Sequence, residues 1–176
     1  MKVIFLDVDG VLNSKKSMLR NYYAGVHVRG IGEDRTDWPD TIMVERVNNI
    51  IKETDAEIVL SSAWRHVGIN KMQEYFRAWG ICKSIIDFTP KLYVKRGIEI
   101  LQWLSNESGK SAEQCCIIDD DSDMLNLMPL LIKTDYNVGI QDIDVEKAIT
   151  LLNQVETWNE IISDMYQMSM SGDSII

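Results

Sequence analysis

The chain has 176 residues, of which 45% are apolar and 26% charged, a composition typical of a globular domain. No apolar run approaches the roughly 20 residues that a membrane-spanning helix needs, so we expect no membrane association. The net charge of −9 and the pI of about 4.7 argue against a protein that grips long nucleic acid over a basic surface.

The cysteines and the first residues bear on the compartment. The chain has three cysteines, of which Cys115 and Cys116 are adjacent in the sequence and Cys82 lies apart. This spacing predicts neither a disulfide framework nor a zinc site. The opening segment does not resemble a signal peptide, because Asp7 and Asp9 interrupt its apolar run. We therefore expect a cytoplasmic protein in a reducing environment.

Apolar periodicity predicts short strands that alternate with helices. In chain order, we expect a strand at 2–6, a short helix at 17–23, a helix at 43–51, a strand at 57–60, helices at 72–79 and 94–104, strands at 115–118 and 130–132, and helices at 144–153 and 155–168. In the helix that begins near Val94, the residues Ile98, Leu101 and Leu104 share one face.

This alternation predicts an α/β domain with three layers, in which helices cover both faces of a mainly parallel, Rossmann-like sheet. We expect one domain over residues 1–168 and a flexible tail at 169–176. Residues 13–40 show no clear period, and they form an excursion too long for an ordinary loop.

Polar side chains follow three of the expected strands. They are Asp7 with Asp9, Ser61 with Ser62, and Asp119 with Asp120. In a parallel sheet the ligand site lies at the carboxyl ends of the strands, so the three pairs meet if the strands are neighbours. Oxygen ligands of this kind suit Mg²⁺, which would offset the repulsion among the carboxylates and neutralise phosphate oxygens. The candidate metal residues are therefore Asp7, Asp9, Asp119 and Asp120.

Several groups could hold a phosphate. The Ser61 hydroxyl can donate to a phosphate oxygen, and Lys95 and Arg96 open a helix from which a cation can balance phosphoryl charge. Arg65 is a second candidate phosphate clamp, and Ser62 is either a phosphate ligand or a cap of a turn or helix. Residues 13–30 contain four cations and no acid, which suits either the reception of an anionic substrate or a solvated basic loop.

Four segments in order resemble the motifs of the haloacid dehalogenase superfamily of phosphohydrolases. They are FLDVDGVLN, IVLSS, the Lys95–Arg96 pair and CIIDDDSD, and the similarity spans residues 1–139. Within the superfamily, SSAWR, KRGIEILQWL and IIDDDSDM resemble the compact domains of nucleic-acid repair polynucleotide 3′-phosphatases and the related 5′(3′)-nucleotidases.

The resemblance implies a role for each matching residue. Asp7 would be the nucleophile and Asp9 the general acid and base, while Ser61 holds the phosphoryl group. Asp120 would bind Mg²⁺ directly, and Asp119 would bind it through water or orient the site. Either Lys95 or Arg96 would be the third-motif cation, Gly10 would form the turn beside the substrate, and residues 13–40 would form a small cap.

Less specific explanations exist for some of these residues. The run from Asp119 to Asp123 begins like a calcium loop, but Met124 and Leu130 stand where that loop needs Gly and Glu. Asp121 and Ser122 are expected to cap the following helix. Asp123 would either cap that helix or orient the third-motif cation. Tyr22 and Tyr23, which lie in the basic segment, and Trp38 could stack on a base.

The sequence thus predicts a Mg²⁺-dependent phosphomonoesterase that works through an aspartyl-phosphate on a nucleotide or a nucleic-acid terminal phosphate. A small-metabolite phosphatase is the alternative enzyme, and a non-catalytic phosphate-binding module is the alternative from another class. The expected partner is a phosphorylated small molecule or nucleic-acid end, and no obligate protein partner can be inferred.

Overall fold

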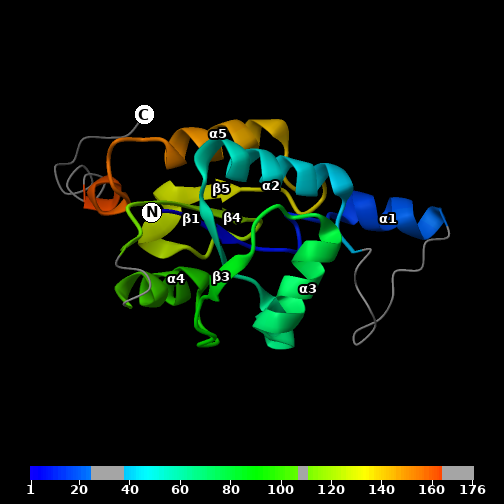
Figure 1. The fold of residues 1–176 in the computed structure, drawn as a ribbon, viewed down its shortest axis with the longest axis horizontal. Coiled ribbons are helices and arrows are strands. Elements are labelled where there is room, and N and C mark those ends of the chain that lie inside the picture. Colours follow the sequence, from blue (N-terminus) through cyan, green and yellow to red (C-terminus); the bar gives the residue numbers. More distant parts are fainter. Residues whose placement is uncertain (25–37, 107–110, 164–176) are drawn as a thin grey trace.

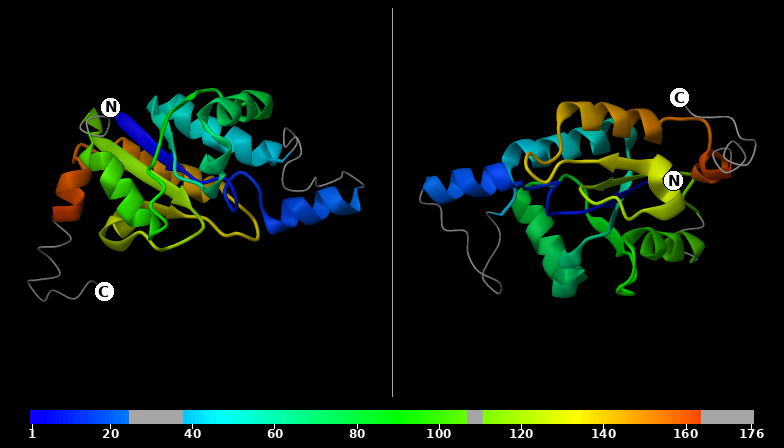
Figure 2. Two further views of the ribbon diagram at one scale, coloured as in Figure 1. Left: turned by 90° about the horizontal axis from the view of Figure 1, so that it is seen from below. Right: turned by 180° about the vertical axis from the view of Figure 1, so that it is seen from behind.

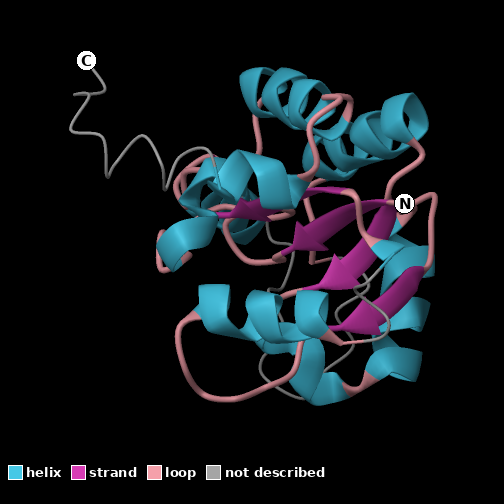
Figure 3. Ribbon diagram, turned by 90° about the vertical axis from the view of Figure 1, so that its left-hand side faces the viewer, coloured by secondary structure: helices cyan, strands magenta, loops and turns pink. Residues whose placement is uncertain are grey.

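A parallel sheet of five strands forms the centre of the protein (Figure 3). The structure is a computed structural model and describes residues 1–24, 38–106 and 111–163. The strand order is β3-β2-β1-β4-β5, with β1 at Lys2–Leu6, β2 at Glu57–Leu60, β3 at Ile85–Phe88, β4 at Gln114–Asp119 and β5 at Leu131–Lys133. All pairs are parallel, which confirms the predicted fold class.

The register brings the carboxyl ends of the three middle strands level. Leu6 of β1 lies opposite Leu60 of β2 on one side and Ile118 of β4 on the other. The backbone N–H of Asp7 donates to the Ile118 carbonyl oxygen, and that of Ser61 donates to the Leu6 carbonyl oxygen. The polar residues that follow these strands therefore begin at the same edge of the sheet.

Three helices share the larger apolar core with the sheet. They are α2 (Thr41–Thr54), α3 (Ile69–Trp79) and α5 (Asp142–Leu152), and α2 runs beside α5 (Figure 1). Their apolar residues recur every three or four positions, as in Met72, Phe76 and Trp79 of α3. Gly80 ends α3 in the left-handed conformation, at a φ of 82°.

A second core lies against Val3, Phe5 and Val59, side chains that alternate in sequence with those of the larger core. It is covered by α4 (Arg96–Ser105), by the short 3₁₀ helix η3 (Leu125–Leu130) and by residues 158–163. The face predicted for α4 is partly wrong. Ile98 is 40% exposed, because the helix is rotated so that Trp103 packs edge-on against Phe5.

The helix α1 (Lys15–Tyr23) projects from the rest of the described chain (Figure 2). It begins at a capping box in which Ser14 and Ser17 bond to each other's backbone N–H. Tyr22 and Tyr23 on its last turn are exposed. The rest of the expected cap, residues 25–37, and the expected tail at 169–176 lie outside the described residues, so both stay predictions.

Two features of the fold differ from the expected elements. The edge strand β3 was not predicted, because it has only four residues and one of them is the polar Asp87, whose carboxylate accepts a hydrogen bond from the Trp103 indole. The helix expected from Val155 begins at residue 158. None of the helices in the described part of the chain combines the length and apolar character that a membrane span requires.

Candidate active site

Three carboxylates meet at the carboxyl edge of the sheet. Asp7 follows β1, Asp119 ends β4 and Asp120 comes next, and one oxygen from each lies within 4.8 Å of the others. Asp119 is fully buried and Asp7 nearly so, whereas Asp120 is partly exposed. The structure thus brings together three of the four predicted metal residues, from segments more than a hundred positions apart.

Gly10 allows this close approach. Its φ is +75°, and a Cβ built on it would lie 2.5 Å from the Asp120 Cγ, closer than real contacts allow. The Thr134 hydroxyl donates to the Gly10 carbonyl oxygen at 2.8 Å and holds the turn in place. The absence of a side chain at Gly10 therefore leaves the space that the Asp120 carboxylate occupies.

Burial makes these acids weaker. Desolvation raises the pKa of Asp7 to about 6, although Arg96 and a hydrogen bond with the Ser62 side chain lower it. Desolvation and the charge of Asp7 raise the pKa of Asp119 to about 8. The pKa of Asp120 is also raised, chiefly by desolvation. The cluster is therefore short of positive charge.

Arg96 is the cation that faces the cluster. Its guanidinium lies 3.6 Å from the Asp7 Oδ1 and 3.5 Å from the Asp119 Oδ2. Burial opposes its charge, but Asp7, Asp119 and Asp123 together raise the pKa of Arg96. Lys95, the other predicted candidate, is the exposed N-cap residue of α4 and does not join this ion-pair cluster.

Asp123 fastens the start of α4. Its Oδ2 accepts from the backbone N–H of Arg96 at 2.9 Å, so it caps α4 rather than the following helix. The expected capping by Asp121 and Ser122 is wrong, because η3 has Met124 as its N-cap residue and no side-chain cap bond. The Asp121 carboxylate accepts instead from the Ser122 N–H.

The two serines after β2 have different surroundings. Ser61 is buried, with 1% of the residue exposed, and its hydroxyl lies 3.5 Å from the Thr89 hydroxyl. Ser62 is fully buried, bonds to the Asp7 carboxylate and accepts from the Trp64 backbone N–H. Ser62 is therefore both a cap of the 3₁₀ helix η1 (Ala63–Val67) and a direct neighbour of Asp7.

Arg65 is placed differently from its predicted role as a phosphate clamp. Its Nε donates to the Ser62 carbonyl oxygen, its Nη1 donates to acceptors of Thr89 and Pro90, and its Nη2 forms an ion pair with Glu99 at 2.7 Å. Both charged side chains are less than a tenth exposed. Because protein groups engage every guanidinium nitrogen, Arg65 connects η1 to α4 and has no nitrogen left for a phosphate in the described structure.

Asp9 is not a member of the carboxylate cluster, although its charge helps to raise the pKa of Asp7 and of Asp120. Its Oδ1 accepts from the Asn13 side-chain amide at 2.8 Å and from the Trp38 indole at 3.2 Å, and its Oδ2 accepts from the Trp64 indole at 2.8 Å. The Asp9 carboxylate is therefore outside the described carboxylate cluster, and the expectation that Asp9 takes part in metal binding stays a prediction. Sequence reasoning considered Trp38 only for stacking on a base and gave Trp64 no role of its own, because nothing local shows which acceptor an indole N–H will find.

The donor set at the sheet edge fits a divalent cation. The Asp119 Oδ2 is buried without a hydrogen-bond partner among the described residues. The Arg96 guanidinium, 3.5 Å away, is shared with Asp7, so a further cation would stabilise this oxygen. Carboxylate oxygens are the ligands that Mg²⁺ prefers, and it commonly takes one or two of them with waters and substrate phosphate oxygens. Asp7, Asp119 and Asp120 are the residues that would hold it.

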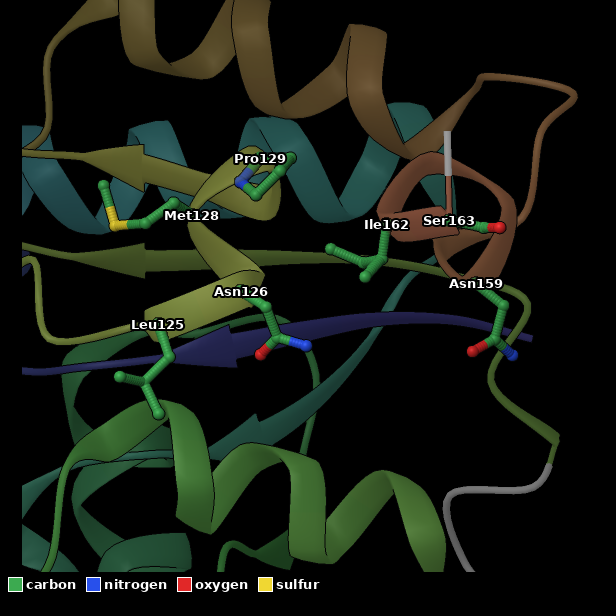
Figure 4. A pocket seen from close by; sticks show the side chains of 7 residues that line it. All are labelled: Leu125, Asn126, Met128, Pro129, Asn159, Ile162 and Ser163. Atoms are coloured by element: carbon green, nitrogen blue, oxygen red, sulfur yellow. The ribbon is translucent and has the colours of Figure 1, made fainter. Parts of the chain in front are cut away.

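Two hollows of the described structure differ in their relation to this cluster. One of about 650 Å³ starts at Asp120 and continues past Lys133, Tyr136 and Gln141. Another of about 530 Å³ lies between η3 and residues 158–163 (Figure 4), and none of the motif residues lines it. Its lining residues are Leu125, Asn126, Met128, Pro129, Asn159, Ile162 and Ser163. Only the first hollow is continuous with the carboxylates.

The comparison with protein families agrees with this geometry. A family model described as the HAD domain in Swiss Army Knife RNA repair proteins matches residues 3–145. The chain belongs to this family. No curated protein and no solved structure matches the chain significantly.

Membership confirms the resemblance to haloacid dehalogenase domains of nucleic-acid repair, and it covers β1 to the first residues of α5. A HAD domain of this family is in broad terms a hydrolase of the phosphatase kind. The superfamily usually uses a divalent metal, which is consistent with the acidic cluster of Asp7, Asp119 and Asp120.

Proposed function

We propose that this HAD domain is a Mg²⁺-dependent phosphomonoesterase that works through an aspartyl-phosphate on Asp7. The observation that carries the proposal is the convergence of Asp7, Asp119 and Asp120 within 4.8 Å, with the Arg96 guanidinium beside them. A carboxylate can attack an anionic phosphorus only where positive charge offsets the repulsion. Bound Mg²⁺ would supply that charge and polarise the phosphoryl oxygens.

Each residue then has a separate task. Asp7 attacks phosphorus, while Arg96 and the Ser61 hydroxyl bind the phosphoryl oxygens. Ser62 orients the Asp7 carboxylate through its hydrogen bond. Asp9 donates a proton to the leaving oxygen and later removes one from the water that hydrolyses the aspartyl-phosphate. Gly10 keeps the turn open for Asp120.

The preferred substrate is a nucleotide or a nucleic-acid end that carries a terminal phosphate. The family description, which names RNA repair proteins, supports this choice. The hollow beside Asp120, with Lys133 and Tyr136 on its wall, offers space for the remainder of the substrate. Lys15 and Lys16 of α1 are exposed, so these two cations of the 13–30 segment are accessible to an anionic substrate.

The proposed domain organisation follows from the same arrangement. The single domain at 1–168 would carry residues 13–40 as a small cap, of which α1 is a described part. A cap of this size would leave the phosphate site accessible to bulky substrates. The net charge of −9 favours small substrates over long polymers, so a small-metabolite phosphatase is the second candidate.

The test is hydrolysis of an aryl phosphate with Mg²⁺ present by the unaltered protein and by Asp7→Asn. We expect the substitution to abolish hydrolysis, while Asp121→Asn, which changes an exposed neighbour of the cluster, leaves it nearly unchanged. Full activity of Asp7→Asn would refute the mechanism. No turnover by the unaltered protein on a broad phosphate panel would instead favour a non-catalytic binding module.

A second measurement distinguishes the substrates. Mononucleotides, oligonucleotides with a terminal phosphate and sugar phosphates are compared at increasing salt. If a polymer is the substrate, KM for the oligonucleotide rises steeply with salt, because its contacts release counterions. A preference for sugar phosphates without this salt dependence would support the small-metabolite alternative.

A further inference from the structure

The Asp9 carboxylate is held by three N–H donors from separate parts of the chain. Asn13 comes from the turn after β1, Trp38 precedes α2, and Trp64 lies in η1 after β2. The three donor–acceptor distances run from 2.8 to 3.2 Å, within the normal range for N–H···O hydrogen bonds. A carboxylate fixed from three directions has little freedom to rotate.

Packing fixes the direction of the indole donors. Trp64 is 3% exposed, and its ring packs edge-on against Tyr75 and Trp79 of α3. The Trp38 ring lies 5.8 Å from the Trp64 ring, centroid to centroid, so the two indoles support each other. An indole N–H only donates, and any backbone carbonyl would satisfy it. Two indoles on one carboxylate at the phosphate site therefore indicate a role for that carboxylate.

Counting acceptor positions identifies the oxygen that is free to react. A carboxylate offers about four lone-pair positions, two on each oxygen. Both positions of the Asp9 Oδ1 are used, by Asn13 and Trp38. The Oδ2 accepts from Trp64, which among the described residues leaves one open position on that oxygen.

We infer that Trp38 and Trp64 are positioning residues that hold Asp9 so that its Oδ2 exchanges protons with the substrate. The inference rests on the proposed function. As the bond from Asp7 to phosphorus forms and the bond to the leaving oxygen breaks, the proton on Oδ2 moves to that oxygen. Water then attacks phosphorus and gives a proton back to Oδ2, while the bond to Asp7 breaks and inorganic phosphate leaves.

The test compares leaving groups in single-turnover experiments with Mg²⁺ present. Trp64→Phe keeps the ring but removes the N–H. A nucleoside is a strongly basic leaving group that needs a proton, so its release from a nucleoside monophosphate should slow by about 100-fold or more, the usual size of general-acid catalysis. Dinitrophenolate leaves without protonation, and its release should change by less than about threefold.

One further variant is a control for the aromatic cluster, and another is a second test of the inference. Trp79→Phe alters the same aromatic cluster, with ring centroids 5.7 Å from Trp64, but Trp79 is not among the donors to Asp9 in the described chain, so it should leave both rates nearly unchanged. Trp38→Phe, at the half-buried donor to Oδ1, should repeat the selective loss if Trp64→Phe does not fold. Thermal unfolding of each variant reports folding.

The outcomes separate this inference from the function on which it rests. Selective slowing of nucleoside release supports it. Equal slowing with both substrates, or no slowing with either, overturns it while the phosphatase activity of the unaltered protein stands. If the unaltered protein releases neither product, the proposed function fails, and the inference fails with it.

Discussion

The Arg96 Nη1 lies 3.6 Å from the Asp7 Oδ1, so that the first residue of α4 faces the carboxylate at the end of β1. The two residues are 89 positions apart in the sequence (96 − 7). The same guanidinium approaches Asp119 from β4. Arg96 thus pairs with two acids whose pKa values are raised by burial. The cluster has too little positive charge, and the effects of substitution, pH and metal on the site follow from this.

Arg96→Ala should reduce hydrolysis strongly and destabilise the protein. Removing one partner of a buried ion pair costs about 3–5 kcal/mol. We expect a cost near the lower limit of this range, because both contacts of Arg96 are long. Lys95→Ala is the matched control, since it removes the neighbouring but exposed cation. Activity assays and thermal unfolding check both variants. An equal effect of the two substitutions would contradict the assignment of Arg96.

Without metal, the protein should lose stability as pH rises from about 4 to about 8. The pKa values of Asp7 and Asp119 rise on folding from 3.8 to about 6 and about 8, so the folded state binds more protons than the unfolded state over this range. The free energy of unfolding therefore falls as pH increases through these pKa values. Denaturant unfolding in chelator at several pH values measures this slope. Asp7→Asn should flatten part of it, and a rise in stability across the same range would refute the assignment.

Mg²⁺ should raise the melting temperature at neutral pH. At a concentration of about 100 times Kd, one site adds about 2.7 kcal/mol, or roughly 5–10 °C for a protein of this length. Asp120→Ala should remove most of this gain, because it deletes one of the three clustered carboxylates. Asp121→Ala is the control, since its exposed carboxylate lies outside the cluster. A full gain in Asp120→Ala would exclude Asp120 as a ligand.

Gly97→Ala should impair the site without touching any acidic residue. A Cβ at Gly97 would collide with the carbonyl oxygen of Met124, so α4 would have to shift and carry Arg96 with it. Crowding of this kind costs about 1–3 kcal/mol. Ile98→Ala, at a half-exposed position on the same helix, should have a smaller effect on kcat. Unfolding and hydrolysis assays on both variants would test whether the position of α4 matters.

The meeting of the carboxylates was predictable because it depends on topology. Short apolar strands between helices imply parallel pairing, and parallel pairing brings residues such as Asp7 and Asp119 to one edge. The choice between Lys95 and Arg96 was not predictable in this way. Consecutive residues at a helix start point in directions about 100° apart, and the capping contact of Asp123 decides where α4 begins.

Long-range pairing of polar side chains accounts for what the sequence did not reveal. Arg65 in SSAWR is the kind of residue that binds phosphate, and no local pattern in the sequence indicates that Glu99, 34 positions away, is its partner. The same holds for Trp64 and Asp9, which are 55 positions apart. Hydrophobic periodicity assigns an indole to the core but does not show which acceptor its N–H will find.

The buried bond between Arg65 and Glu99 has a mechanical consequence. It joins the turn that carries Ser62 to the helix that carries Arg96, and Glu99 also accepts from the Leu92 backbone N–H ahead of that helix. The Ser62 hydroxyl, which orients Asp7, and the Arg96 guanidinium are thus parts of one rigid frame. The Asp7 carboxylate and the Arg96 guanidinium would therefore already be in position when a phosphate arrives. Little of its binding free energy would be consumed in reorganising the protein, and more would remain to favour the transition state.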